Sequence, residues 1–555
     1  MDRPASHVWG RLRRPSGQAV ERWEHMKRSG VLNQRGSRLG GILAVVVLIL
    51  AACGGAEDGG DGESADPAGA ESEDAGDEGH YGGDLRMAVS ADASSLDPQS
   101  GPSGTDHIIL YPMYDTLIDF DPETTEPRPG LAQAWEFTDP TTLRLELQPD
   151  VQFHDGTDMD AEAVKASLER FQEVGAHLDL AVVESIDVVD ELTVELNLAQ
   201  PDSSIVLVLA DRAGMVVSPS AAEEHGDEFE TNPVGAGPFQ FVEWREGDQI
   251  SMERFEDYWQ EDLPYLDSIR MDVLTDRGAA TNAILGGEIH FSDSLDHAQR
   301  DQLDAGDLVV QADNSVWVQM MYLNMSHEPL DDVRVRQAIN YAINREDVLQ
   351  AATGGAGEVA RSPVPSTHWA YDPATEDAWE HDPDRARELL EEAGVADGFE
   401  ISGTFMTDAT DLRRNEVIQA QLEEVGIQYD LNPMDLTQGV TEFFEEQSFD
   451  VAQYAWSGRP DPGQTYFRLF AAESYQNPGD VAIDGMEQAI NAAVEVEDID
   501  ERAERYADVN ELMVESAPWV PLYFQANLTA HVPELRNYEP NLLGKPKVAE
   551  VQLAD

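Results

Sequence analysis

The only cysteine of the 555-residue chain, Cys53, directly follows Leu50-Ala51-Ala52, a leucine and two small residues. A thiol in this setting is the acceptor for a lipid in secreted lipoproteins, and basic residues such as Lys27 and Arg38 precede the apolar run 42–50, as a secretory signal requires. The run is shorter than the roughly 20 apolar residues that span a bilayer. Since no second cysteine exists for a disulfide, we expect lipidation at Cys53 of a mature chain that begins there.

Other chemically capable residues form no catalytic set. His154-Asp155 has the types of a general base and its orienting carboxylate, but the pair ends a predicted strand and is simpler to interpret as a turn. Gly235-Ala236-Gly237 lacks the third glycine of a dinucleotide-binding loop. No Gly-x-Ser-x-Gly elbow and no His-x-x-x-His pair occurs in the sequence. We expect no catalytic residue, no metal and no cofactor.

The elements around these residues alternate between strand and helix patterns. Residues 84–89, 142–147 and 192–198 alternate as strands do, and 151–156 ends in an Asp-Gly turn. A helix should follow that turn, capped by Asp158 or Asp160, with one apolar face. Its face comprises Ala161, Val164, Leu168 and Phe171.

The second half of the chain shows further helix patterns. Asp332 can cap a helix whose buried face contains Val335, Ile339 and Ile343. Arg334 and Arg336 are expected on the other faces of this helix. Pro383 suits the first turn of a helix that Gly394 ends. Helices are also expected at 415–425 and 500–515. The fold class is therefore mixed α/β.

The charge of the chain is strongly negative, with 35 Lys+Arg against 109 Asp+Glu and a formal net charge of −74. The 52 residues before Cys53 hold nine basic and three acidic residues, so the mature chain carries 26 and 106, a charge of −80. Self-repulsion of this size destabilises a compact state unless salt screens it. We expect a salt-rich environment and no nucleic-acid partner, because no basic patch is present.

The composition divides the chain into a leader, a tether and a folded part. Residues 1–52 read as the signal, with Met26 as an alternative start, and 53–83 are almost entirely Gly, Ala, Ser, Asp and Glu, which favours an acidic flexible tether. The remaining roughly 470 residues exceed one ordinary core, so at least two lobes are expected.

A series of short motifs then runs through the folded part in a fixed order. Each motif alone is weak evidence for a protein family. Together, in this order and after a lipidation signal, they are strong evidence. They are Leu96-Asp97-Pro98, Tyr114-Asp115-Thr116-Leu117, Pro129-Gly130-Leu131-Ala132 with Trp135, Val151-Gln152-Phe153-His154-Asp155-Gly156, Asn232-Pro233-Val234-Gly235-Ala236-Gly237-Pro238-Phe239, Tyr258-Trp259, Asp332-Val333-Arg334-Val335-Arg336-Gln337-Ala338-Ile339, Asp382-Pro383 through Leu389-Leu390 to Ala393-Gly394, and Trp456-Ser457-Gly458-Arg459-Pro460-Asp461-Pro462. Through them the chain resembles the family 5 extracellular solute-binding proteins of ABC transporters, the peptide, opine and nickel group.

This resemblance implies a two-lobed, periplasmic-binding-protein-like α/β fold of class II, with an extra subdomain in lobe I and a ligand cleft between the lobes. Lobe I is expected at 84–310, lobe II at 311–514, and a return to lobe I at 515–555. It also implies a monomeric receptor that is not an enzyme. The receptor would sit at the outer face of the cell membrane and deliver solute to a permease.

The resemblance also implies where the solute binds, and there this chain departs from the pattern. In peptide-binding members an acid that follows Trp-x-Gly pairs with the α-ammonium of the ligand, whereas here Trp456-Ser457-Gly458 is followed by Arg459, and the nearest acid is Asp461. Arg459 would favour a carboxylate or phosphate, or would pair with a local acid. Further candidates are Tyr454, Ser94, Ser95 and Trp317, with Tyr322 beside Trp317.

The predicted function is a lipid-anchored receptor for a peptide or peptide-like solute. Within the same fold the alternatives are an oligosaccharide, opine or metal-chelate receptor. Outside it they are a secreted hydrolase and a surface sensor or adhesin.

Overall fold

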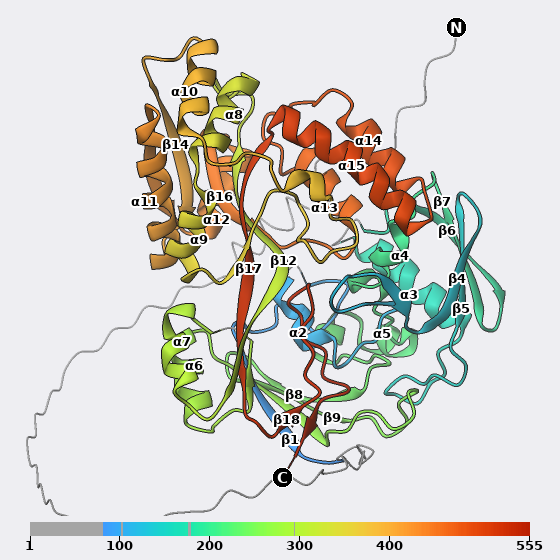
Figure 1. The fold of residues 1–555 in the computed structure, drawn as a ribbon. Coiled ribbons are helices and arrows are strands. Elements are labelled where there is room, and N and C mark those ends of the chain that lie inside the picture. The colour runs from blue at the N-terminus through green and yellow to red at the C-terminus, as the bar shows by residue number, and fades with distance from the viewer. Residues whose placement is uncertain (1–80, 102–103, 176–178, 294, 555) are drawn as a thin grey trace, which may run out of the picture. The chain divides into compact units, whose positions relative to one another are not determined.

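Two long antiparallel strands, β12 (Val309–Leu323) and β17 (Trp519–His531), run between the lower and upper halves of the computed structural model (Figure 1). The structure describes residues 81–554 apart from 102–103, 176–178 and 294. One end of the β12–β17 pair lies beside β11 (Phe291–Ser292) and the other beside β16 (Val451–Trp456). The two strands therefore cross between two lobes.

The first lobe builds its part of the 11-stranded sheet beyond β17. The parallel strands β11 and β1 pair through Met87 and Phe291, and β1 pairs in parallel with β10. Alternate side chains of these strands, among them Leu85, Met87 and Met271, are buried in one hydrophobic core. The strands, in sheet order, are β11 (Phe291–Ser292), β1 (Asp84–Val89), β10 (Ser268–Val273), β9 (Gln249–Arg254) and β8 (Phe239–Arg245).

The second lobe continues the same sheet on the other side of β12. Its core contains Ile339, Leu389 and Ile418, one from each of three helices that cover the sheet. Its strands are β16 (Val451–Trp456), β14 (Phe399–Met406), β15 (Ile427–Met434) and, paired with β17, β13 (Gly357–Val359). Its helices are α8 (Val333–Ala342), α9 (Arg345–Thr353), α10 (Pro383–Glu392), α11 (Ala409–Glu424), α12 (Leu436–Val440), α13 (Pro462–Phe470), α14 (Met486–Val494) and α15 (Ile499–Ser516).

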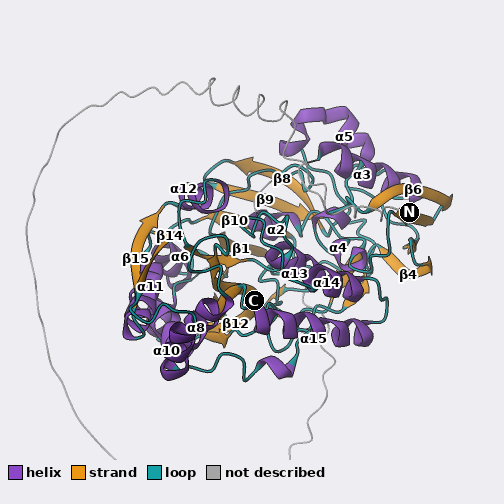
Figure 2. Ribbon diagram, turned by 90° about the horizontal axis from the view of Figure 1, so that it is seen from above, coloured by secondary structure: helices purple, strands orange, loops and turns teal. Residues whose placement is uncertain are grey.

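A separate four-stranded antiparallel sheet, next to the helix α3 (Ala161–Val174), belongs to the first half of the chain. The Asp160 side chain caps α3 by accepting from the Ala163 amide at 2.9 Å, and Gly175 ends the helix with a left-handed backbone. Figure 2 shows α3 and β6 on the side of the molecule opposite α10 and α11. The strands are β4 (Ala132–Asp139), β5 (Thr142–Leu147), β7 (Thr193–Leu198) and β6 (Val183–Asp190).

Short elements complete the first lobe. The helices are α2 (His107–Leu110), α4 (Ile205–Val208), α5 (Pro219–His225), α6 (Arg277–Leu285) and α7 (Arg300–Asp304), and the strand pairs are β2 (Ile118–Phe120) with β3 (Pro127–Pro129) and β18 (Leu535–Arg536) with β19 (Gln552–Leu553). The predicted signal, Cys53 and nearly all of the tether, 53–80, lie outside the described residues. The limits assigned to the lobes in the sequence analysis stay predictions.

Candidate functional site

A cavity of about 280 Å³ lies where the lobes face each other across β12. The first lobe supplies most of one wall, the segment after β16 supplies the other, and Trp317 of β12 stands between them. We call it the solute cavity. It is lined by Gly104, His107, Asp179, Val208, Asp211, Arg212, Ala213, Trp317, Ser457, Arg459, Gln464 and Lys545.

The backbone at Gly458 brings the Trp456–Arg459 segment close to the crossing strand. Gly458 has φ +65°, and a Cβ atom there would lie 2.4 Å from the Val316 side chain. Only glycine allows this approach without displacing β12. The β12–β17 register is broken between Asn314 and Val318, and Trp317 lies in that irregular stretch.

Arg459 places its guanidinium over the Trp456 ring, 4.9 Å from the ring centroid. It donates to the Gly458 carbonyl at 2.6 Å and to Ser457 Oγ at 3.1 Å. Burial lowers the pKa of Arg459, and Arg468 lowers it further. Within the described residues no carboxylate lies within 4.0 Å of Arg459, so part of its donor fork faces the solute cavity without an anion.

The carboxylate of Asp211 on the first-lobe wall is already engaged. It contacts His107 Nε2, accepts from the Arg212 amide at 2.9 Å, and lies 3.5 Å from Lys545 Nζ. Burial alone would raise the pKa of Asp211, but the positive charge of Lys545 and the hydrogen bond to His107 hold it well below its usual value. Burial lowers the pKa of His107 to about 4, so the imidazole is neutral at pH 7.

The second carboxylate of the lining, Asp179, is also occupied. Its Oδ1 accepts from Gln464 Nε2 at 3.1 Å and lies 3.5 Å from the Arg468 guanidinium, both on α13. This contact links the lobes. Arg212 is held by Asp106 at 3.2 Å.

The lining is thus slightly cationic in a strongly acidic protein. Arg212, Arg459 and Lys545 face Asp179 and Asp211. Burial lowers the pKa of Lys545 to about 8, against the opposing effect of Asp211. The arrangement suits an anionic group that approaches Arg459 and Lys545.

Three of the residues predicted from sequence line the solute cavity, namely Trp317, Ser457 and Arg459. Trp456 is buried beneath Arg459 and donates from Nε1 to Thr465 Oγ1 at 3.2 Å. Gly458 packs against β12 as described above.

The other predicted residues lie outside the lining. Asp461 is fully buried, pairs with Arg502 at 2.9 Å and caps α13 through the Gly463 amide. Tyr454 is buried and lies 3.4 Å from Thr404 Oγ1, and Tyr322 packs edge-on against Phe444. Ser94 bonds Asp106, the partner of Arg212, and Ser95 bonds Ser100 at 3.0 Å.

Sequence reasoning missed the first-lobe wall, because His107, Asp179, Asp211 and Lys545 stand in no common motif. One signal was available for Lys545. The chain has four lysines, at 27, 165, 545 and 547, so two of them share one tripeptide near the C-terminus.

Two α/β lobes on one shared sheet, with a charged cavity at two crossing strands, define a two-lobed solute-binding protein. The chain belongs to the bacterial extracellular solute-binding proteins, family 5, whose model for the middle region matches residues 126–478.

Comparison with known proteins gives the same class. The glutathione-binding protein GsiB of Salmonella paratyphi A is 29% identical over 484 residues, which cover 82% of this chain and 91% of GsiB. Two solved structures share the fold: the DppA periplasmic binding protein of Helicobacter pylori in complex with the peptide STSA (TM-score 0.74, 24% identity, 86% and 99% of the two chains) and the AgaA protein of A. tumefacien R10 with agropinic acid (TM-score 0.73, 22% identity, 85% and 99%).

Family membership confirms three predictions. The fold is the two-lobed periplasmic type, the chain is a solute-binding receptor of an ABC importer, and it is not an enzyme. Its family works on the outer side of the cytoplasmic membrane. Among the described residues, no helix has both the length and the apolar character to span a bilayer.

Proposed function

We propose that this receptor binds a peptide or peptide-like solute through an anionic group that Arg459 and Lys545 hold. The observation that carries the proposal is the Arg459 guanidinium, which faces the solute cavity with no described carboxylate within 4.0 Å. Trp456 supports the flat face of the guanidinium, which fixes its fork for bidentate contact with a carboxylate.

The occupied carboxylates narrow the solute class. Asp211 is held by His107 and Lys545, and Asp179 by Gln464 and Arg468. Neither is free to take the α-ammonium of a peptide without breaking an existing pair. The favoured solute therefore presents an anion to this wall and has its amino group elsewhere or substituted.

A second candidate follows from the same observation. An opine carries carboxylates on a substituted nitrogen, and a lining in which Arg459 has no described carboxylate within 4.0 Å while both acids are engaged fits that chemistry. The solved AgaA complex contains agropinic acid in the same fold. Oligosaccharides and metal chelates have no comparable support in the lining.

The lipid anchor belongs to the proposal as well, because the signal at Cys53 would hold the receptor at the membrane. Cys53→Ser should release the protein from the membrane fraction. A protein that stays membrane-bound after this change would contradict lipidation at Cys53.

The decisive experiment is native mass spectrometry of the purified protein, to identify a solute that copurifies in the cavity. Isothermal titration with a pool of di- to pentapeptides, with opines and with oligosaccharides as parallel arms should then give heat with the first or second pool. Tight binding of an oligosaccharide with no heat from either other pool would refute the proposed solute class.

A further inference from the structure

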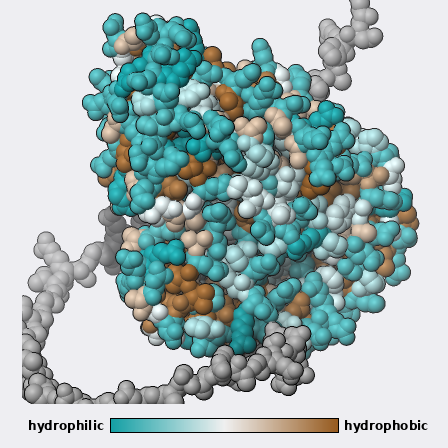
Figure 3. Space-filling view, viewed as in Figure 1, coloured by the Kyte–Doolittle hydropathy of each residue, from teal (hydrophilic) through white to brown (hydrophobic). Residues whose placement is uncertain are grey.

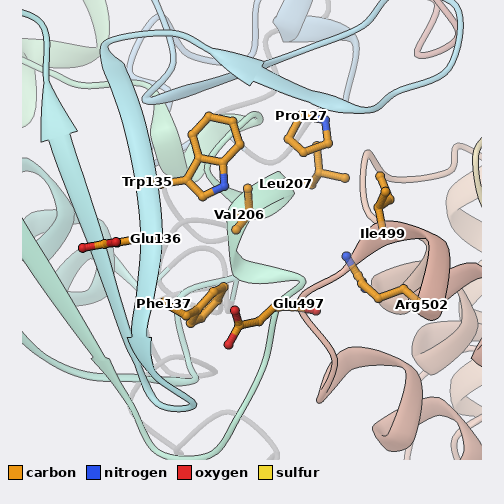
Figure 4. Close-up of a pocket in the computed structure, with 10 residues that line it drawn as sticks. Pro127, Trp135, Glu136, Phe137, Val206, Leu207, Glu497, Ile499 and Arg502 are labelled. Carbon is orange, nitrogen blue, oxygen red and sulfur yellow. The ribbon is translucent and has the colours of Figure 1, made fainter.

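A second cavity, of about 240 Å³, lies between the lobes and shares no lining residue with the solute cavity. The helix α4 contributes to both: Val208 lines the solute cavity, whereas Val206 and Leu207 line the second one. We call the second cavity the seam pocket. Figure 4 shows Trp135 and Phe137 of β4 on one side of it, and Ile499 and Arg502 of α15 on the other.

Six of the ten residues that line the seam pocket are apolar, and the other four are Glu136, Ser203, Glu497 and Arg502. Trp135 and Phe137 are half-buried, and Glu136 between them is exposed, with its side chain extending to the other side of β4 from Trp135 (Figure 4), as alternation along a strand requires. Ser203 Oγ is buried at the lining and has no hydrogen-bond partner among the described residues. The pocket can therefore take an apolar group and one hydrogen-bonding group beside it.

The contact between the lobes creates this pocket. The Ser203 amide donates to the Val494 carbonyl of the second lobe at 2.7 Å. Arg502 is fixed from behind by Asp461 at 2.9 Å, so its position in the lining is set by the second-lobe interior. If the lobes separate, Trp135 and Ile499 no longer face each other, and the pocket is lost.

Acidic side chains surround the second-lobe side of the seam pocket. Glu497 lines the pocket itself. The surface groove along the first turns of α15 adds Asp498, Asp500, Glu501, Glu504 and Asp508, with Arg505 as its one described cation.

We propose that the seam pocket is the docking site for an extracytoplasmic loop of the permease, which inserts one aromatic or branched apolar side chain flanked by lysine or arginine. The six apolar residues of the lining fit the inserted side chain, and Glu497 with the acidic α15 surface fits the flanking cations. Since both lobes build the pocket, a permease that needs it engages only the closed receptor. The proposal rests on delivery to a permease and is independent of the class of solute.

Site-specific photocrosslinking in intact cells of the source bacterium tests this contact. Phe137→p-benzoylphenylalanine should give a crosslinked product that mass spectrometry identifies as a permease subunit. Val242→p-benzoylphenylalanine is the matched control, because Val242 is an apolar residue of β8 with 53% exposure and no part in the pocket. No permease product from position 137, or an equal yield from position 242, would overturn the proposal.

A transport assay gives an independent answer. Ile499→Asn should reduce uptake of an isotope-labelled di- to pentapeptide pool at least about tenfold, as loss of an interface hot spot does, while its affinity for the same pool in titration stays at the wild-type value. Val242→Asn should retain uptake. If the Ile499→Asn variant takes up the pool as fast as the wild-type protein, docking at the seam pocket is refuted. If the wild-type protein does not bind the peptide pool at all, the proposed solute class is refuted, and the crosslinking experiment alone decides whether the permease docks here.

Discussion

Arg459 occupies the position where the family pattern leads one to expect an acid, and its replacement tests the binding proposal directly. Arg459→Ala should weaken binding of an anionic solute by at least about 1.5 kcal/mol, the contribution of a charge-assisted hydrogen bond. Titration calorimetry measures the change. Arg413→Ala is the matched control, since Arg413 is exposed on α11 and does not line the solute cavity. Unchanged affinity in the Arg459 variant would show that this guanidinium does not contact solute.

If Lys545 holds the anion as we propose, we expect solute binding to depend on pH. Burial and the positive charges of Arg459 and Arg212 lower the pKa of Lys545 to about 8, whereas the negative charge of Asp211 acts to raise it. A bound anion favours the charged ammonium and raises the Lys545 pKa, so binding takes up protons near pH 8 and weakens as the pH rises above it. His107, with a pKa of about 4, stays neutral across this range.

The measurable effect is a fall in affinity of about two- to tenfold between pH 7 and pH 9.5, because one pKa unit corresponds to a tenfold change. Titration in two buffers of different ionisation enthalpy should reveal the proton uptake. Lys545→Met should remove the pH dependence, whereas Lys165→Met on α3 should keep it. A Lys545→Met protein with the full pH dependence would assign it to another group.

At the scale of elements, Asp461 ties the start of α13 to α15. It is fully buried, accepts from Arg502 with both oxygens and caps α13 through the Gly463 amide at 2.8 Å. Asp461→Ala would leave a buried guanidinium without its counter-ion, and we expect the free energy of unfolding to fall by about 3–5 kcal/mol. Urea denaturation measures this loss.

Asp498→Ala is the control for Asp461, since Asp498 caps α15 by accepting from the Glu501 amide at an exposed site. Asp498→Ala should lower the free energy of unfolding by only about 1 kcal/mol, the contribution of a helix cap. If Asp461→Ala keeps its stability but loses solute binding, Asp461 contacts the solute instead of holding α13.

Elements defined by neighbouring residues could be predicted from the sequence. Asp160 caps α3 and Pro383 opens α10, as expected, because a capping carboxylate and a proline act within one turn. The strand predicted at 142–147 is β5. The helix predicted at 415–425 begins earlier, at Ala409, where Asp408 accepts from two backbone amides.

Contacts between distant segments could not be predicted in this way. Arg336 was expected away from the buried face of α8, but it is buried and donates to the carbonyls of Ser516 and Leu330. A charged residue that binds backbone carbonyls leaves no pattern in its own helix. For the same reason the meeting of His107 and Lys545 at Asp211 depends on the return of the chain after β17.

At the scale of the whole molecule, a slightly cationic cavity lies inside a strongly acidic protein. Acids outnumber bases by 109 to 35 over the full chain, so most carboxylates have no cation to pair with. Figure 3 shows hydrophilic residues over most of the visible face. This surface would repel the anionic solute that we propose at long range, whereas Arg459 and Lys545 would attract it at contact. Salt screens the repulsion among exposed surface charges more strongly than the attraction of buried cations for a bound anion. Salt should therefore favour both folding and solute binding.

Stability should therefore rise with ionic strength. Below about 0.1 M salt the Debye length exceeds roughly 10 Å, and repulsion among the carboxylates extends across each lobe. We expect the melting temperature, followed by circular dichroism at pH 7, to fall steadily as potassium chloride is reduced from about 1 M, where the Debye length is about 3 Å. Caesium chloride at equal ionic strength should give the same curve, because screening depends on charge and concentration alone. A melting temperature that does not change with salt would mean that the folded protein tolerates its charge without screening, and the inference of a salt-rich environment would be wrong.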